Sequence, residues 1–246
     1  MKAQLVRIDR LLPTQREAMY ALLNTHFEGV RRDVFNHDLA QKNWVILLEE
    51  SQGDSTVLKG FSTFLIYERE FAGEIVNVVY SGDTIVDPSA WSSSVLSRAW
   101  ISAINQLRRQ YKNGKLYWLL ICSGYRTYRF LPVFCQEFFP CYDRATPPDI
   151  QKLIDRLAID RFGSLYNQTT GIVSFPHPYK LNHDLSGIPA ERLIDRHIQF
   201  FEQQNPDHVL GDNLVCLAEV VETNLTPAGR RIWRSESLLP ESLTPA

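Results

Sequence analysis

The sequence has no long hydrophobic run and no excess of basic charge. Its 246 residues include 26 Lys or Arg and 28 Asp or Glu, a formal charge of -2 at pH 7, which disfavours nucleic-acid binding. No segment approaches the roughly 18 consecutive apolar residues of a membrane span, and the N-terminus lacks a signal peptide's apolar core. We therefore expect a cytoplasmic protein without a membrane span and without a nucleic-acid partner.

Paired metal-binding cysteines are also missing. The four cysteines, Cys122, Cys135, Cys141 and Cys216, form no C-x-x-C pair, and no histidine follows at zinc-finger spacing. Free cysteine is among the most buried residue types. We expect four buried, reduced thiols and no metal site.

Strand and helix patterns alternate, which predicts an α/β fold. Residues 57–67 and 74–86 predict long strands after a shorter one at 44–48, and the continuously apolar LYWLLIC at 116–122 is typical of a strand at a sheet centre. Other strands are expected at 4–8, 171–175 and 213–220, and helices near 13–29, 31–42, 88–112, 126–138, 147–161 and 189–204.

The pattern changes near Pro140. We expect residues 1–140 to form the core and residues 141–226 to form an extension that packs on it and completes the same sheet. Residues 227–246 contain three prolines and few apolar residues, which is typical of a mobile tail.

The stretch SGDTIVDPSAW, residues 81–91, is where a strand runs into a predicted helix start. Pro suits the first helical position, and Asp or Ser suits the cap. The first N–H groups of a helix are unpaired and favour a phosphate, and Ser92, Ser93 and Ser94 would add hydroxyl donors beside them. Helix capping alone explains the serines equally well, so both interpretations stay open.

The order of elements from about Leu5 to Pro140 resembles the GNAT acyltransferase superfamily, through the strand hairpin, the IVDP turn at 85–88 and the FF pair at 138–139. The resemblance implies a mixed, mainly antiparallel sheet with splayed strands, flanked by helices, and acetyl-CoA or another acyl-CoA as the donor. By position in the motif, it assigns cofactor binding to Ile85, Val86, Trp91, Ser92, Ser93, Ser94, Val95 and Leu96.

Two motifs depart from the family pattern, the phosphate loop and the tyrosine position. Where the family has Arg or Gln, then Gly, then Gly or Ala, this chain has Trp91, Ser94 and Leu96, and the position of an often catalytic tyrosine holds Phe134. Glycine allows close backbone approach, so these bulkier residues narrow the expected phosphate site. An acyl carrier protein is therefore an alternative donor, because no nucleotide pyrophosphate would then have to bind.

The strand at 74–86 supplies the predicted base. Asn77, Ser81 and Asp83 share one face by the two-residue period of a strand, and Gly82 predicts a bulge that redirects Asp83. A carboxylate beside an opening between strands can have a raised pKa and accept a proton from an amine. We predict Asp83 as general base and Asn77 and Ser81 as substrate-binding residues. The alternative is that Asp83 caps a turn or pairs with an arginine.

The segment SGYRTY at 123–128 leaves the central strand at the same end of the sheet, where ligands tend to bind. Ser123 could hold the thioester carbonyl, and Tyr128 could protonate the leaving thiolate. Tyr125 and Arg126 would contact the substrate. Tyrosines near core positions are also commonly packing residues with a satisfied hydroxyl.

The sequence thus predicts an N-acyltransferase that moves an acyl group from a CoA or carrier-protein thioester to the amine of a small molecule or peptide. A noncatalytic GNAT-like module that binds a ligand or protein is the second interpretation, motivated by the missing glycines and by Phe134. A hydrolase that uses Cys122 or Ser123 is the third, but spacing assigns it no His and acid partner.

Overall fold

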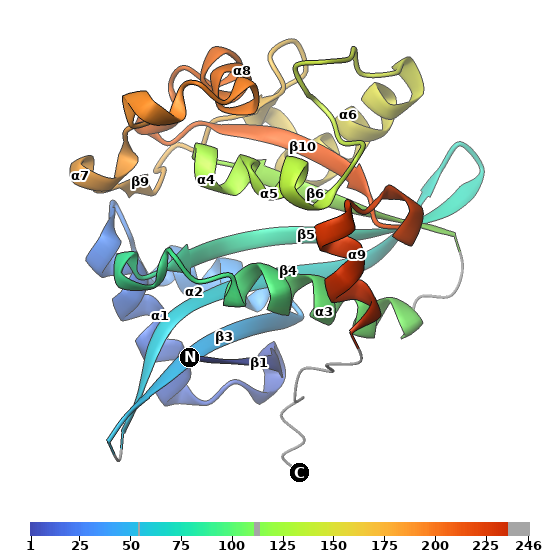
Figure 1. Ribbon diagram of the computed structural model, residues 1–246. Coiled ribbons are helices and arrows are strands. Elements are labelled where there is room, and N and C mark those ends of the chain that lie inside the picture. The colour runs from blue at the N-terminus through green and yellow to red at the C-terminus, as the bar shows by residue number, and fades with distance from the viewer. Residues whose placement is uncertain (54, 111–113, 236–246) are drawn as a thin grey trace.

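One mixed sheet organises the chain (Figure 1). The computed structural model describes residues 1–53, 55–110 and 114–235. Within that part, eight strands lie in the order β1-β3-β4-β5-β6-β10-β8-β7, and only the β5–β6 pair is parallel. The predicted α/β fold with a mixed, mainly antiparallel sheet is confirmed. The strands are β1 (Lys2–Arg7), β3 (Trp44–Gln52), β4 (Ser55–Phe71), β5 (Glu74–Val86), β6 (Lys115–Cys122), β7 (Tyr166–Asn167), β8 (Ile172–Val173) and β10 (Asn213–Glu219).

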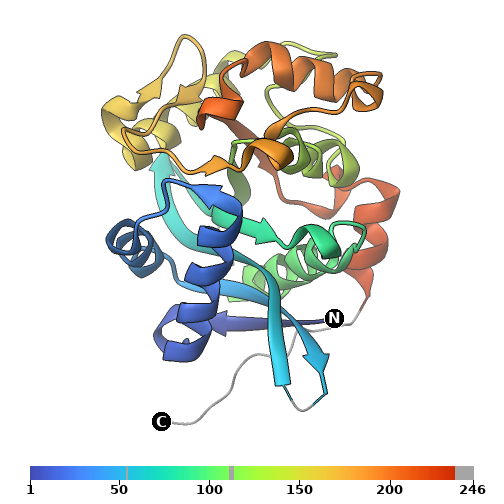
Figure 2. The same cartoon turned by 90° about the vertical axis from the view of Figure 1, so that its left-hand side faces the viewer.

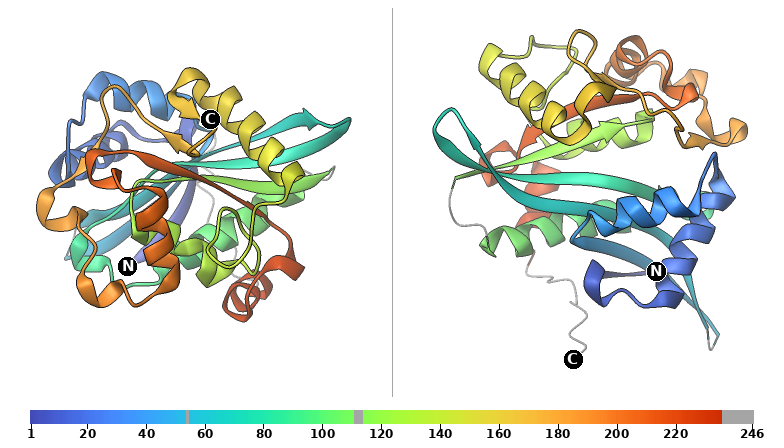
Figure 3. Two further views of the ribbon diagram at one scale, coloured as in Figure 1. Left: turned by 90° about the horizontal axis from the view of Figure 1, so that it is seen from above. Right: turned by 180° about the vertical axis from the view of Figure 1, so that it is seen from behind.

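Helices cover both faces of this sheet (Figure 3). One face packs against α3 (Val95–Leu107), α4 (Tyr125–Tyr128), α5 (Phe130–Phe134), α8 (Arg196–Gln204) and α9 (Pro227–Arg234). The other face packs against α1 (Pro13–His26), α2 (Arg32–Ala40) and α6 (Pro148–Phe162). A two-stranded sheet of β2 (Phe27–Glu28) and β9 (Lys180–Leu181) joins the end of α1 to the segment before α7 (His183–Ser186). Strands buried on both faces explain the apolar run of β6.

β5 and β6 separate before they end. Their parallel pairing runs from Val76 opposite Lys115 to Ser81 opposite Leu120. Beyond Ser81, β5 stays paired with β4 as far as Val86, while the end of β6 stays paired with β10. The two strands therefore splay, which leaves an opening at this end of the sheet.

A β-bulge lies at the start of the splay. Ser62 pairs with Thr84 and Phe64 with Ser81, so Thr63 on β4 faces both Gly82 and Asp83 on β5. The predicted bulge at Gly82 is confirmed. Because one extra residue reverses the alternation of side chains, Asp83 lies on the α1–α2 face and not on the face of Ser81.

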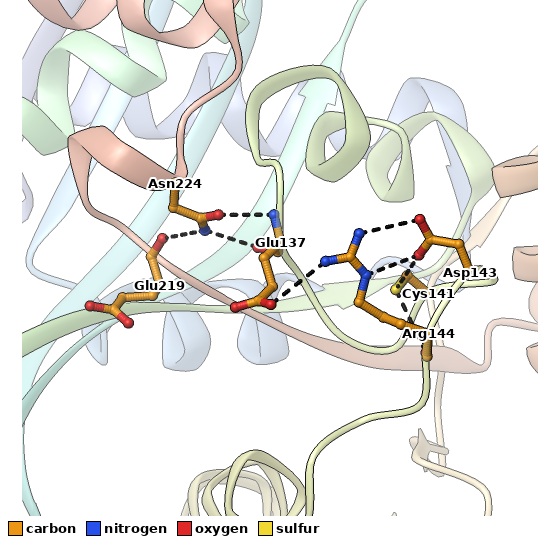
Figure 4. A network of polar contacts seen from close by, with 6 residues as sticks. All are labelled: Glu137, Cys141, Asp143, Arg144, Glu219 and Asn224. Carbon is orange, nitrogen blue, oxygen red and sulfur yellow. Dashed lines mark hydrogen bonds and ion pairs between the residues drawn. The ribbon is translucent and has the colours of Figure 1, made fainter.

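The expected helix at 126–138 is wrong beyond Phe134. It is split into α4 and α5, after which Cys135 and Phe139 form antiparallel bridges with Leu225 and Leu217. The side chain of Asn224 accepts from the N–H of Glu137 and donates to its carbonyl, both at 2.9 Å (Figure 4). Pairing with the C-terminal part of the chain therefore replaces helical hydrogen bonds here.

Two C-terminal predictions also need correction. The helix expected at 189–204 starts only at Arg196, where Asp195 caps it by accepting from the N–H of His197. Residues 227–235 are not a mobile tail, since they contain α9, whose Trp233 is buried against α3. The remainder of the predicted tail, 236–246, lies outside the described residues.

Candidate functional site

A pocket of about 670 Å³ opens where β5 and β6 separate. Its walls are the end of β5 with the following turn, the segment from Ser123 through α5, and the C-terminal stretch 179–192. The end of α1 also contributes, through His26. His26 Nε2 lies 3.4 Å from a carboxylate oxygen of Asp87, the residue that ends the strand-to-turn segment. Figure 2 shows β9 running past the end of α1 on this side of the molecule.

The turn after β5 differs from the expected helix start. Pro88–Ala90 is a single 3-10 turn, in which Asp87 accepts from the N–H of Ser89, and α3 begins only at Val95. The indole of Trp91 donates to the carbonyl of Val86 at 2.8 Å, which folds the turn back on the strand. Of the predicted cofactor-binding residues, the pocket is lined by Ile85, Val86, Trp91, Ser92, Ser93 and Leu96. Among the residues described, Ser94 and Val95 lie outside the lining.

The opposite wall comes from the segment after β6. Ser123, Tyr125 and Arg126 all line the pocket, as the sequence predicts for one shared site. The Arg126 guanidinium lies 4.0 Å from the Trp91 ring centroid, and it donates to the carbonyl of Leu185 at 3.1 Å. Arg126 thus joins both sides of the opening to the C-terminal stretch. Burial lowers the pKa of Arg126.

Asp83 is not among the described residues that line the pocket; it directly precedes the pocket-lining Thr84, and its charge acts on Tyr179, which lines the pocket. Burial and, second, the negative charge of Asp38 raise the pKa of Asp83 to about 7, while the charge of Lys42 acts in the opposite direction. Asp83 does not pair with Arg126; its charged neighbours are Asp38 and Lys42. A carboxyl with this pKa is half ionised near neutral pH, which suits a general base.

Lys42 is a functional candidate that the sequence did not reveal. It is 5% exposed, and its ammonium lies 2.5 Å from a carboxylate oxygen of Asp38. Burial lowers the pKa of Lys42, and the charge of Asp38 counters that effect. In the sequence Lys42 only follows a predicted helix, so no local pattern marks it. Its position depends on Gly82, where a Cβ atom would overlap Cε of Lys42.

Tyr179 connects the pocket with Asp83, and it too carries no sequence signal. Its ring lines the pocket, and its hydroxyl is buried without a hydrogen-bond partner among the described residues. Burial first, and then the charge of Asp83, raise the pKa of Tyr179, so its phenol stays protonated at neutral pH. The Tyr179 hydroxyl is close enough to Asp83 for the carboxylate charge to act on it, but no hydrogen bond joins the two groups among the described residues.

Three predicted site residues belong to the core. Tyr128 is fully buried and donates to the carbonyl of Pro140 at 2.9 Å. Ser81 accepts from the indole of Trp118 at 2.6 Å, and Asn77 is fully buried in the paired part of β5. In the described part of the chain, none of the three lines the pocket. The predictions of Tyr128 as acid and of Asn77 and Ser81 as substrate-binding residues are therefore corrected.

The four cysteines are buried and reduced, as predicted. In the ranges 1–53, 55–110 and 114–235, no group of three or more His, Cys, Asp or Glu residues could hold a metal ion. In the same ranges, every helix is too short or too polar to cross a membrane.

Comparison with protein-family models gives no match, and comparison with curated proteins gives none either. Solved structures do match. A conserved protein from Enterococcus faecalis is 16% identical, with a TM-score of 0.40 over 56% of this chain and 33% of its own. A GNAT-family acetyltransferase from Bacillus anthracis is 14% identical, with a TM-score of 0.37 over 56% of this chain and 84% of its own. An aminoglycoside 6'-N-acetyltransferase complexed with coenzyme A is 9% identical, with a TM-score of 0.38 over 88% of this chain and 97% of its own.

The chain thus aligns with only a third of the Enterococcus protein, and identities of this size concern the fold and not the activity. The strand order comes from the hydrogen-bonded pairing of the strands and does not depend on these identities or TM-scores. β4 and β5 form an antiparallel pair, β5 and β6 are parallel and splay apart, and α3 follows the turn after β5. On this topology, the chain has a divergent GNAT-like fold.

Proposed function

We propose that the protein is an N-acyltransferase that moves an acyl group from a thioester of CoA, or of a carrier-bound phosphopantetheine arm, to an amine. The observation that carries the proposal is Asp83, a carboxyl with a pKa raised to about 7 that the β5 bulge places directly before the pocket-lining Thr84. A base works best when its pKa lies near the operating pH. The pocket also fits a donor with phosphates, because Ser92, Ser93 and Arg126 line it.

In the proposed reaction, Asp83 accepts a proton from the attacking amine, directly or through one water. The nitrogen forms a bond with the thioester carbonyl carbon, and the carbon–sulfur bond breaks. Ser123 donates to the carbonyl oxygen, where negative charge develops. Tyr179 gives its proton to the leaving thiolate, and the proton on Asp83 then returns to Tyr179 through water. The products are an amide and a thiol, so protons and electrons balance.

Ligand binding is tested first by thermal unfolding in the presence of CoA, acetyl-CoA and longer acyl-CoAs. A ligand at a hundred times its dissociation constant adds about 2.7 kcal/mol to the free energy of unfolding. For a chain of this size, that corresponds to a rise in Tm of roughly 5–10 °C. No rise with any of these compounds would count against a CoA-dependent enzyme.

Turnover is then measured with acetyl-CoA and a panel of small-molecule and peptide amines. Asp83→Asn should lower kcat by roughly 100-fold or more, with CoA binding unchanged, since it removes the base. Tyr179→Phe should lower kcat as well. Tyr128→Phe is the matched control, because this buried hydroxyl lies outside the pocket lining. CoA binding without turnover of any amine would favour the noncatalytic module instead.

A further inference from the structure

Arg126 carries a positive charge that is held in place by uncharged groups. Its guanidinium lies over the rings of Trp91, at 4.0 Å, and Tyr125, at 4.7 Å, and donates to the carbonyl of Leu185. Among the described residues, no carboxylate lies within ion-pair distance of it. These contacts orient the guanidinium but leave its charge without compensation, although the side chain is partly buried.

A second arginine approaches from the C-terminal stretch. Arg192 ends the 3-10 turn Ala190–Arg192, lines the same pocket, and lies near enough for its charge to lower the pKa of Arg126 further. Across the described ranges Arg192 forms no ion pair either, although Glu191 also lines the pocket. By contrast, Arg129 lies in the same wall but pairs with Asp195 at 3.5 Å. Two guanidiniums that line one pocket and form no ion pair among the described residues are an arrangement that can bind an anion.

The anion would lie next to the turn that leads into α3. Trp91 belongs to that turn and contacts Arg126 directly, so α4 and the start of α3 face each other across the opening (Figure 1). Ser92 and Ser93 line the pocket beside Trp91 and add hydroxyl donors.

We propose that Arg126 and Arg192 form an anion subsite that binds a phosphate of the acyl donor through side-chain guanidiniums. The identification of the ligand as an acyl donor rests on the proposed function, whereas the binding of a phosphate does not. Phosphates occur both in free CoA and in the phosphopantetheine arm of a carrier, and the subsite would bind a phosphate from either source.

The subsite is tested by calorimetric titration of the full chain with pyrophosphate. Each of the single variants Arg126→Gln and Arg192→Gln loses one charged hydrogen-bonding partner of the anion. Each should therefore bind pyrophosphate roughly tenfold more weakly than the wild type. Arg129→Gln, whose charge is already paired, should change the affinity by less than about twofold. Arg192 is exposed, so its variant keeps the fold even if Arg126→Gln disturbs the Trp91 contact. Absence of pyrophosphate binding, or equal affinities in wild type and Arg192→Gln, would overturn the subsite.

Titration with CoA, 4'-phosphopantetheine and pantetheine separates this proposal from the proposed function. Phosphopantetheine should bind more tightly than pantetheine, and both arginine variants should reduce that ratio without weakening pantetheine binding. A preference for CoA over phosphopantetheine would identify free CoA as the source of the phosphate, and equal affinities would identify the carrier arm. If pyrophosphate binds and none of the three thiol compounds does, the acyltransferase proposal fails while the anion subsite stands.

Discussion

Asp83 is the residue whose ionisation dominates the site. Burial disfavours its charged form, Asp38 adds like-charge repulsion, and the charge of Lys42 stabilises the carboxylate. The folded protein therefore holds a proton on Asp83 to a higher pH than the unfolded chain does. This has a consequence for stability as well as for catalysis.

Stability should fall as the pH rises through this titration. The unfolded pKa of aspartate is about 3.9 and the folded value about 7, so between these pH values the folded state binds more protons. The free energy of unfolding then decreases with pH, by at most about 1.4 kcal/mol per pH unit from this group, and levels off above pH 7. In urea unfolding at pH 4 to 8, Asp83→Asn should lose this slope, whereas the exposed Asp149→Asn should keep it. An unchanged slope in Asp83→Asn would contradict the raised pKa.

Asp38 and Lys42 should move the pKa of Asp83 in opposite directions. Asp38→Asn removes a negative charge and should lower it, whereas Lys42→Met removes a positive charge and should raise it. NMR titration of the Asp83 side-chain carboxyl measures both shifts without a substrate. Shifts in the same direction would mean that a structural change, and not charge, controls this group.

At the scale of elements, the bulge in β5 determines where Asp83 lies. A Cβ at Gly82 would overlap Cε of Lys42 and lie 2.7 Å from Oγ1 of Thr63. Gly82→Ala should therefore displace Lys42, destabilise the fold by roughly 1–3 kcal/mol and change the pKa of Asp83. Gly187→Ala is the control, since nothing lies within 4 Å of its added Cβ. Thermal unfolding and the same NMR titration measure the two effects, and equal behaviour of both variants would show that the bulge tolerates a side chain.

Features with local signals were predictable from the sequence. The β4–β5 hairpin, the strand ending in V-D-P and the bulge at Gly82 depend on residues within a few positions of one another. The end of α5 was not predictable, because Phe134 is followed by residues that pair with a strand about 80 to 90 positions later. Lys42 and Tyr179 were missed for the same reason, since each gains its role only from long-range contact with β5 or the pocket.

At the scale of the whole molecule, the pocket depends on contact between the N-terminal and C-terminal parts of the chain. β9 pairs with β2 directly after α1, and Asn182 makes two hydrogen bonds at this junction. Its N–H donates to the carbonyl of His26 and its side-chain amide to the carbonyl of Thr25, both at 3.0 Å. The stretch 179–192, which supplies Tyr179 and Arg192, is held over the opening by these bonds and by Arg126.

Weakening this junction should loosen the wall of the pocket without unfolding the sheet. Asn182→Ala removes one side-chain hydrogen bond, worth about 0.5–1.5 kcal/mol, and should speed amide hydrogen exchange in residues 179–187 roughly two- to tenfold. Ser186→Ala, which loses only a bond to the nearby His183 carbonyl, should leave residues 179–182 unchanged. Pyrophosphate should slow exchange around Arg192 in the wild type and less so in Asn182→Ala, because part of the binding energy is then used to order the wall. Equal protection in both proteins would mean that the anion subsite forms independently of the β2–β9 junction.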